Sequence, residues 1–352
     1  MKRPWTWICP LTWICPLSSL SRAGFPLAAF TAVFLTTGVL TATPAPAISV
    51  IVNRVQSNNT TPAVDSFADY LASLPVNEGD RRGYWGNRGP QPDLITTRRI
   101  IYLALVACLG TANVSYQYFT SGGYSGVNIV GVLRGVGPSP IKQYVIGAHY
   151  DSDQNPGADD DASGVAGLLE AARVLRNYQF AGTIKFVVFD QEEERANGWG
   201  KGSRHAANLA AASGDHIEAM VGLDMIAYNH RGRNRACISR CNSRKGTPAA
   251  RLAAAFQDYS GLQTNRMTGE NASDPYRYYV AGFPAVLVSE EFDSDGWPFN
   301  PFYHSKWDFY LSQSGAPLMH AGRPYIDLDY ASKIVRGVVG WVATEAGYSR
   351  PR

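Results

Sequence analysis

The sequence predicts a three-layer α/β/α sandwich with a mostly parallel central sheet, on two observations. Short apolar, largely β-branched runs suit buried strands, and they fall at residues 128–133, 143–148, 183–190, 219–228 and 285–289. Helical patterns lie between and after them, at residues 163–177, 203–212, 248–259 and 330–344. Strands that alternate in this way with helices form a sheet covered by helices on both faces.

The helix at residues 163–177 shows the pattern most clearly. Its apolar residues recur at helical spacing and make one face to lie on a sheet: Val165, Leu168, Leu169, Ala172 and Leu175. Before the sheet, helical patterns fill residues 64–74 and 97–109. Residues 77–92 between them are rich in Gly, Arg, Asn and Pro and predict an exposed loop.

Length and composition predict one large domain, at residues 48–352. With 45% hydrophobic and 17% charged residues, the chain can bury a substantial core. The formal charge is +3, but three of the 32 basic residues and no acidic residue precede position 48, which leaves 29 basic against 29 acidic residues. The Arg-rich stretch 230–244 is expected to be one solvated loop. The charge balance therefore gives no reason to expect a nucleic-acid partner.

The N-terminus predicts an exported protein. A basic start is followed by an apolar run at residues 25–40 and by Ala45-Pro46-Ala47, the small-x-small pattern that signal peptidase reads. We therefore expect residues 1–47 to be a signal peptide and the protein to be periplasmic or secreted. The apolar run is shorter than the roughly 20 residues of a spanning helix, so contact with a membrane is expected only if this segment stays uncleaved.

Cys237 and Cys241 are candidates for a disulfide. The other cysteines are Cys9 and Cys15 in the predicted signal and Cys108 in an apolar run. An exported protein can keep a disulfide, and a C-x-x-x-C pair in a loop could close a small ring. A zinc site at this pair is not expected, because no second pair of ligands stands nearby.

Acids and histidines lie at the ends of four of the predicted strands, and one of them, Asp224, lies within the predicted strand 219–228. They occur in the segments His149-Tyr150-Asp151, Asp190-Gln191-Glu192-Glu193-Glu194, Leu223-Asp224-Met225 and Tyr303-His304-Ser305, and an Asp triplet precedes the first helix after the sheet begins. Taken singly, the Asp triplet is an ordinary helix cap and the Glu triplet an ordinary solvated face. Active sites of open α/β sheets form beyond the carboxyl ends of the strands, and all these residues are expected there.

These residue types suit a site for two divalent ions. Such a pair needs a shared carboxylate, a carboxylate and an imidazole on each ion, and an open position for water. Asp160 can be shared, His149 and Asp224 can complete one zinc site, and Glu193 and His304 the other. Glu192 can then act as general base, and Asp151 can orient the His149 imidazole. Mixed ligands of this kind also accept other divalent metals.

The segments resemble a known family in order and wording. The matching motifs are GAHYDS, PGADDDASGV, FVVFDQEEE, GLDMIAYN, SDPYRYYVAGFPAVLVSEE and YHSKWD. They are similar to the two-zinc exopeptidases of the bacterial leucyl aminopeptidase type, relatives of glutamate carboxypeptidase and glutaminyl cyclase, whose fold is phosphorylase/hydrolase-like. The resemblance covers residues 127–308 and implies the same metal ligands and the same base.

The resemblance also implies roles that the residues alone left open. It makes Asp160 the shared ligand, with Asp159 and Asp161 as loop and cap residues, and it matches Ser273 to a residue that supports the distal histidine. Two departures concern the substrate. The stretch between Glu194 and Gly202 is long and contains Trp199, as in glutaminyl cyclases, and Pro275 replaces the usual His.

The implied activity is a metal-dependent aminopeptidase that acts on peptides with a free N-terminus, through attack by a bridging hydroxide. A glutaminyl-peptide cyclase, which needs only one zinc, is the first alternative. A carboxypeptidase is a further alternative, and a binding protein that has lost catalysis is another. Because all five ligands and the base are present, the sequence favours hydrolysis.

Overall fold

The central sheet has eight strands in a computed structural model that describes residues 45–58, 65–84, 89–121, 123–136, 142–193, 199–241, 248–269 and 271–352. The strand order is β1-β2-β5-β3-β6-β9-β7-β8. The bounds are Val114–Ser121 for β1, Tyr124–Leu133 for β2, Lys142–His149 for β3, Thr183–Phe189 for β5, His216–Leu223 for β6, Arg235–Arg240 for β7, Gln263–Thr268 for β8 and Ala285–Ser289 for β9.

The four strands in the middle of the sheet, β5, β3, β6 and β9, are parallel to one another. Strands β2 and β7 flank them in the antiparallel sense, while β7 and β8 are parallel to each other. The prediction of a mostly parallel sheet is confirmed. Parallel neighbours matter for function because their carboxyl ends, and the loops that follow, meet at one edge of the sheet.

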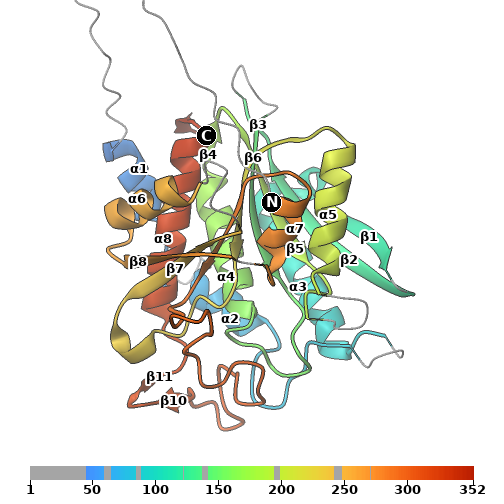
Figure 1. Cartoon of the computed structure of the whole chain (residues 1–352), viewed down its shortest axis with the longest axis vertical. Helices are drawn as coiled ribbons and strands as arrows, with labels where there is room; N and C mark the ends of the chain where they lie inside the picture. The colour runs from blue at the N-terminus through green and yellow to red at the C-terminus, as the bar shows by residue number, and fades with distance from the viewer. Residues whose placement is uncertain are drawn as a thin grey trace, which may run out of the picture. The chain divides into compact units, whose positions relative to one another are not determined.

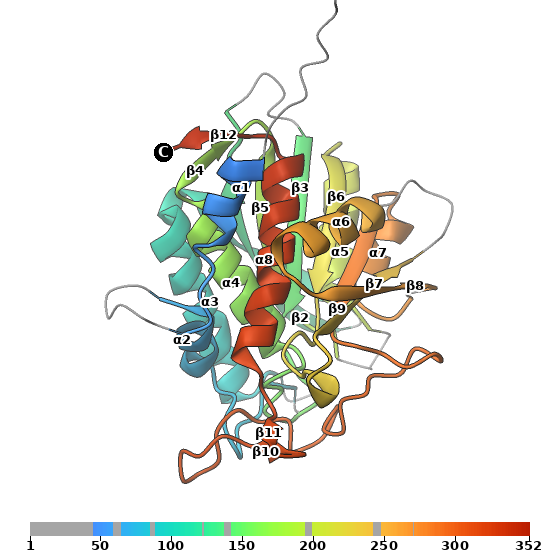
Figure 2. The same ribbon diagram turned by 90° about the vertical axis from the view of Figure 1, so that its left-hand side faces the viewer.

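Helices cover both faces of the sheet (Figures 1 and 2). Helices α5 and α7 contact one another on one face, and α4, α6 and α8 pack together on the other, where α1 joins α8, α2 joins α4, and α3 contacts β2. The bounds are Ala45–Val52 for α1, Phe67–Ser73 for α2, Pro92–Leu109 for α3, Ala162–Leu175 for α4, Lys201–Ala212 for α5, Ala249–Tyr259 for α6, Asp274–Val280 for α7 and Leu328–Glu345 for α8. The three-layer sandwich is therefore confirmed.

Short elements complete the fold. A two-stranded sheet joins β4, Tyr178–Phe180, to β12, Tyr348–Pro351, and a second joins β10, Met319–His320, to β11, Arg323–Pro324. The 3-10 turns Thr111–Asn113 and His230–Gly232 lie in connections.

Local sequence fixes where the helices begin and end. Asp161 caps α4 by accepting a hydrogen bond from the Gly164 amide, and Ser66 and Asp69 form a reciprocal capping box at α2. At the C-terminal end of α3, Gly110 has a φ of +83°, a backbone conformation that strains residues with a Cβ. The cap of α4 matters most, because it sets the loop that carries Asp160.

Several predictions about the elements are wrong. The strand predicted at residues 219–228 ends at Leu223, so Asp224 lies beyond the strand and not inside an apolar run. Strands β1, β7 and β8 and helix α7 were not predicted. The loop predicted to be exposed at residues 77–92 buries Arg82 and Tyr84, which are 0% and 4% exposed.

The predicted disulfide is also wrong. Cys237 lies buried within β7, and both Cys237 and Cys241 are thiols in the structure. Cys241 directly follows β7. Residues four apart along an extended chain are roughly 13 Å apart, whereas a disulfide needs Cα atoms within about 7 Å. Residues 235–240 of the stretch predicted as one solvated loop thus form a strand of the sheet.

The N-terminal prediction falls mostly outside the described residues. Helix α1 begins at Ala45, and its residues Ile48, Ile51 and Val52 are buried in the main core. Among the helices of the described residues, none combines the length and apolar character that a membrane crossing requires.

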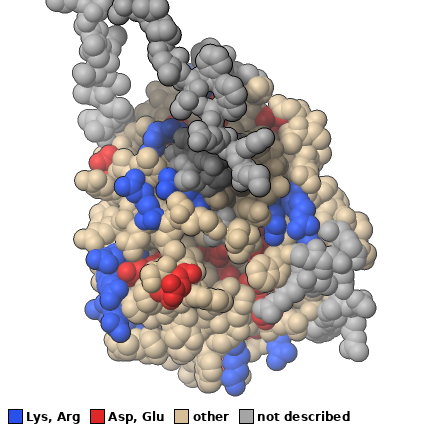
Figure 3. Space-filling model, in the orientation of Figure 1, with Lys and Arg blue, Asp and Glu red and all other residues tan. Residues whose placement is uncertain are grey.

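On the face seen in Figure 3, basic side chains lie in separate groups, with acidic ones between them.

Candidate metal centre

Residues from four neighbouring strands meet at the carboxyl edge of the sheet. His149 is the last residue of β3, Asp224 follows β6 directly, and the Glu192-Glu193 pair follows β5 by three residues. Asp160 lies in the loop before α4, and His304 lies in the long segment after β9. The structure therefore brings together all five predicted ligands and the predicted base.

Asp160 stands between the two imidazoles. Its Oδ1 lies 3.3 Å from His149 Nε2, and its Oδ2 lies 3.2 Å from His304 Nε2. His149 Nε2 also lies 3.8 Å from Asp224 Oδ1, and His304 Nε2 lies 2.8 Å from Glu193 Oε1. One carboxylate thus faces two separate imidazole-carboxylate pairs, with one oxygen toward each.

Two divalent cations fit these side chains. Ligand atoms of His149, Asp160 and Asp224 lie within 4.8 Å of one another, and so do those of Asp160, Glu193 and His304. Imidazole nitrogens and carboxylate oxygens are common ligands of zinc. A divalent cation in each triad would take the place of the protons shared between the imidazoles and the carboxylates. The grouping agrees with the assignment predicted from the sequence.

Glu192 is buried beside the ligands. It is 7% exposed, and its carboxylate lies within 4.8 Å of ligand atoms of His149 and Glu193. Burial raises the pKa of Glu192 well above its usual value, against the opposing charge of His149. A carboxyl in this environment is suited to accept and return a proton.

Asp151 contacts the site in a different way from the one predicted. His149 Nδ1 lies 3.1 Å from the Asp151 backbone carbonyl and 3.7 Å from its carboxylate, so the carbonyl is the nearer partner of the imidazole. The carboxylate instead accepts hydrogen bonds from the amides of Glu192 and Glu193, each at 3.0 Å. Asp151 therefore fixes the backbone that carries the base and one ligand.

The two other acids of the triplet serve the backbone, as the resemblance implied. Asp161 accepts from the amides of Gly164, His149 and Met225. Asp159 accepts from the Ala227 amide at 2.8 Å and from Asn300 Nδ2 at 2.8 Å. These bonds tie the loop before α4 to the ends of β3 and β6.

Ser273 supports an aspartate in the structure. Its hydroxyl donates to Asp224 Oδ2 at 2.7 Å, whereas the resemblance implied support of the distal histidine. Ser273 is the cap residue of α7, so the helix that the sequence analysis did not predict is the element that places this hydroxyl. The bond leaves Asp224 Oδ1 directed at His149.

The two imidazoles and their carboxylates shift one another's pKa values. Burial lowers the pKa of His149, but the neighbouring carboxylates of Asp151, Asp160 and Asp224 raise it well above its usual value. The same balance, with Asp160 and Glu193 as partners, raises the pKa of His304 to about 10. The pKa of Asp160 is held below its usual range because two imidazoles outweigh burial. These pKa shifts show that the cluster of carboxylates favours positive charge at its centre, which bound cations would supply.

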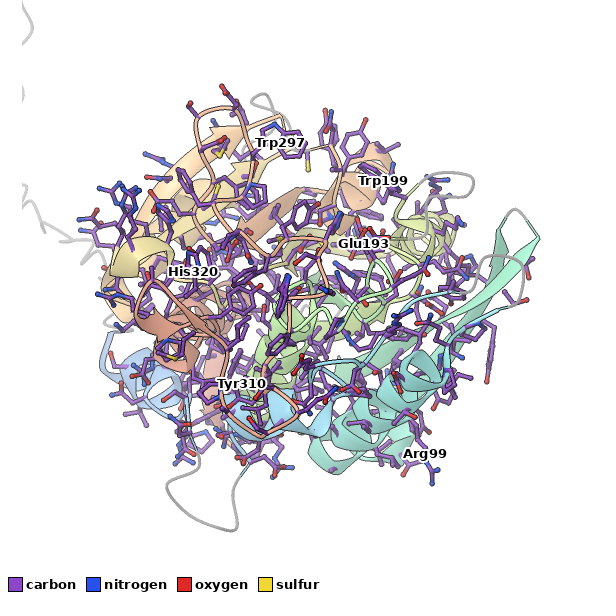
Figure 4. All side chains as sticks on the ribbon, turned by 90° about the horizontal axis from the view of Figure 1, so that it is seen from below. Arg99, Glu193, Trp199, Trp297, Tyr310 and His320 are labelled. Atoms are coloured by element: carbon purple, nitrogen blue, oxygen red, sulfur yellow. The ribbon has the colours of Figure 1, made fainter. Side chains whose placement is uncertain are left out.

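A cavity of about 410 Å³ opens onto the ligands. Its apolar wall is formed by Met225, Leu287, Phe292, Trp297, Pro298 and Trp199. Figure 4 shows Trp199 and Trp297 on the same side of Glu193. Trp297 is 65% exposed, so its indole offers apolar surface at the mouth of the cavity. The nearby aromatic residues Tyr276, Tyr278, Tyr279 and Phe302 do not line this cavity.

The sequence did not predict a set of hydrogen bonds that connects the N-terminal part of the chain to the strands that carry the site. The Tyr84 hydroxyl donates to Asp190 Oδ1 at 2.7 Å, and Arg98 bonds to both Asp190 and the Tyr150 hydroxyl. Asp190 and Tyr150 adjoin the residues of the site in sequence. The only signal for these hydrogen bonds in the sequence was Asp190, an acid at the end of an apolar strand.

An α/β sandwich with imidazoles and carboxylates gathered at the ends of its parallel strands defines a class of candidate metal-dependent hydrolases. The comparisons place the chain within that class. The model of peptidase family M28 matches residues 128–323, more than half of the chain, and the chain belongs to this family.

Individual relatives match over parts of their length. Uncharacterized protein YfbL of Escherichia coli is 32% identical over 196 residues, which are 45% of this chain and 58% of that protein. Aminopeptidase YwaD of Bacillus subtilis is 27% identical over 201 residues, 55% of this chain and 42% of that protein. The chain thus spans about half the length of these two relatives.

Solved structures share the fold. The LapA aminopeptidase of Legionella pneumophila superimposes with a TM-score of 0.66 at 19% identity, over 86% of this chain and 75% of that one. The glutaminyl cyclase of Macrostomum lignano gives 0.62 at 19% identity, over 85% and 92%. At these identities, the similarity concerns the fold alone.

Proposed function

We propose that this chain is an aminopeptidase that uses two zinc ions to release N-terminal residues from peptides. The observation that carries the proposal is Asp160, whose two oxygens face His149 on one side and His304 on the other. Membership of the M28 family and the match to the YwaD aminopeptidase support it. His149 and Asp224 would hold one ion, Glu193 and His304 the other, and Asp160 both.

The chain's own residues supply the proton transfer. Bound ions would polarise the peptide carbonyl and acidify the attacking water. Glu192 is buried beside both triads, so it can take the proton of the water and return it to the amine that leaves. Asp151 holds the Glu192 amide and thereby keeps the carboxylate in place during both transfers.

Tyr303 is placed to stabilise the carbonyl oxygen as it becomes negative. Its ring stacks on His304 with centroids 3.8 Å apart, and Tyr303 lines the cavity. Burial and the charges of Asp160, Glu193, Asp224 and Glu192 raise the pKa of its phenol, which stays protonated and able to donate.

We predict that Tyr303→Phe lowers kcat by about 100-fold with little change in KM, as the loss of one donor to a developing oxyanion typically does. Steady-state kinetics on an aminoacyl amide measures this. Tyr276→Phe, an equivalent change outside the cavity, is the control and should leave kcat unchanged. An unchanged kcat in Tyr303→Phe would remove this donor from the mechanism.

The substrate class can be tested with one panel. We expect hydrolysis of amides of leucine, phenylalanine and lysine, with the apolar wall of the cavity favouring leucine and phenylalanine. N-acetyl-leucine amide, which has no free amine, should not be cleaved. A chelator should abolish hydrolysis, and added zinc should restore it. Cleavage of the acetylated substrate at the rate of the free one would contradict the aminopeptidase assignment.

Glutaminyl cyclisation is the second candidate. The fold similarity to a glutaminyl cyclase and the tryptophan Trp199 in the cavity favour it. Asp160 argues against it, because a reaction at one zinc does not need a carboxylate shared between two sites. An N-terminal glutaminyl peptide added to the panel separates the two reactions, since cyclisation without hydrolysis of the other substrates would overturn the proposal.

We also propose that the protein is exported with cleavage after Ala47. The burial of Ile48 and Ile51 in the main core supports a domain that includes the residues directly after this position. N-terminal sequencing of the protein from the cell envelope or medium should begin at Ile48. A start at Met1 in a membrane fraction would show instead that the segment is retained as an anchor.

A further inference from the structure

Arg82 lies behind the candidate metal centre and outside the part of the chain that matches the family. Its side chain is 0% exposed, and its guanidinium donates to three backbone carbonyls. The acceptors are Tyr150 at 2.7 Å, Pro156 at 2.9 Å, and Gly157. These carbonyls span residues 150–157. This segment begins directly after His149 and ends three residues before Asp160.

The backbone of Arg82 adds to this connection. Its carbonyl accepts from the Ser152 amide at 2.8 Å, and its amide donates to the Asn155 carbonyl at 3.3 Å. Both main chain and side chain of one residue therefore hold the same eight-residue segment. A planar guanidinium with donors in a fixed fork can serve three carbonyls at once, which a lysine ammonium on a flexible stem cannot match.

Two glycines permit the close approach. A Cβ on Gly157, whose φ is +59°, would lie 2.5 Å from Arg82 Nη2. A Cβ on Gly83 would lie 2.8 Å from the Ser152 carbonyl oxygen and 2.9 Å from the Gln154 amide. The chain around the guanidinium has room for this arrangement only because side chains are missing at these two positions.

The buried charge of Arg82 interacts with acids around the candidate metal centre. A buried guanidinium without nearby negative charge would be costly. Burial lowers the pKa of Arg82, and the charges of Asp308, Asp161, Asp151 and Asp160 raise it. The positive charge therefore lies close to the acids that surround the ligands, and Arg82 does not line the cavity.

We propose that Arg82 is a positioning residue of the metal centre, which holds residues 150–157 so that His149 and Asp160 stand at binding distance before a metal arrives. The inference rests on the proposed zinc site. It assigns a role in metal affinity to a residue that makes no contact with substrate. A residue with only a structural role would stabilise the metal-free and the zinc-bound protein equally.

The test compares Arg82→Lys with Arg173→Lys. Arg173 is a largely buried arginine near the far end of α4, where it bonds to Glu170 and to the Arg54 carbonyl. For each variant and the wild type, the melting temperature is measured without metal and with saturating zinc, and the zinc Kd is measured by competition with a chromophoric chelator. Binding to the folded state alone makes the zinc-induced rise in Tm a measure of affinity.

We expect Arg82→Lys to weaken zinc binding by about 10- to 100-fold, the range seen when residues that orient metal ligands are changed. Its zinc-induced rise in Tm should shrink, while Arg173→Lys should lower both melting temperatures and keep the rise. An unchanged Kd and an unchanged rise in Arg82→Lys would overturn the proposal. If the wild type itself binds no zinc, the proposed function fails instead.

A measurement on the wild type covers the case in which Arg82 variants do not fold. The Ser152 amide, bonded to the Arg82 carbonyl, should be protected from hydrogen exchange in the metal-free protein, together with the Tyr150 and Gln154 amides, which also donate to backbone carbonyls. Protection that appears only after zinc is added would show that the metal, and not Arg82, orders this segment.

Discussion

Replacing Glu192 with glutamine is expected to lower the rate of peptide hydrolysis by about 100- to 10,000-fold, the range for loss of a general acid-base group. The amide of glutamine has nearly the same shape but cannot take a proton from water. Because Glu192 is not one of the five ligands, zinc content should stay the same. The change removes the proton acceptor and leaves the pocket intact.

Steady-state kinetics with leucine amide and elemental analysis of the same preparation measure both quantities. Glu291→Gln is the matched control, because Glu291 is also a buried acid just beyond a strand of the sheet, and it pairs with Arg233 and Arg235 away from the ligands. That variant should keep its activity. Hydrolysis near the wild-type rate in Glu192→Gln would show that another group is the base.

Replacing Asp160 with asparagine is expected to remove bound zinc and, with it, more than about 100-fold of the activity, since even residues behind metal ligands are worth 10- to 100-fold. An amide nitrogen would stand where one of the two carboxylate oxygens faces an imidazole. At least one of the two sites then loses a ligand, and the loss of negative charge weakens the other.

Asp159→Asn separates this effect from a general disturbance of the loop. Asp159 accepts hydrogen bonds from Ala227 and Asn300 and faces neither imidazole in an ion pair. Its asparagine variant should be less stable but should keep its zinc. Equal loss of zinc in the two variants would contradict the assignment of the shared ligand to Asp160.

The strand ends were predictable because chemistry and fold point to the same residues. The central strands β3, β5 and β9 are apolar runs bounded by polar residues, and such runs give both the sheet and the edge at which ligands gather. Once that edge is known, His149 falls on it without further information, whereas Asp224 was predicted to lie inside its strand. The sequence therefore pointed to the residues that the structure brings together at this edge.

The outer strands were not predictable in the same way. β7 reads Arg-Ala-Cys-Ile-Ser-Arg, with an arginine at each end and only four buried residues between them, so its pattern does not stand out from the Arg-rich stretch around it. β8 lies at the edge of the sheet and has no fully buried residue. The disulfide prediction failed for this reason, because it assumed a loop where the chain is extended.

The supporting residues depend on tertiary contacts that leave no local pattern. Arg82 lies in a stretch whose glycines and asparagines indicate an exposed loop, yet it is buried because residues 150–157 fold over it. Asp151 was recognised as a residue of the site, but its carboxylate holds two amides that are some 40 positions away. Only the packing of β3 against β5 brings these groups together.

The most direct test of the two-ion site is anomalous diffraction at the zinc edge from crystals of the zinc-saturated protein. The predicted result is two peaks, one between His149 and Asp224 and one between Glu193 and His304, with Asp160 contacting both. A single peak, or a peak that Asp160 does not contact, in a preparation that hydrolyses leucine amide would contradict it.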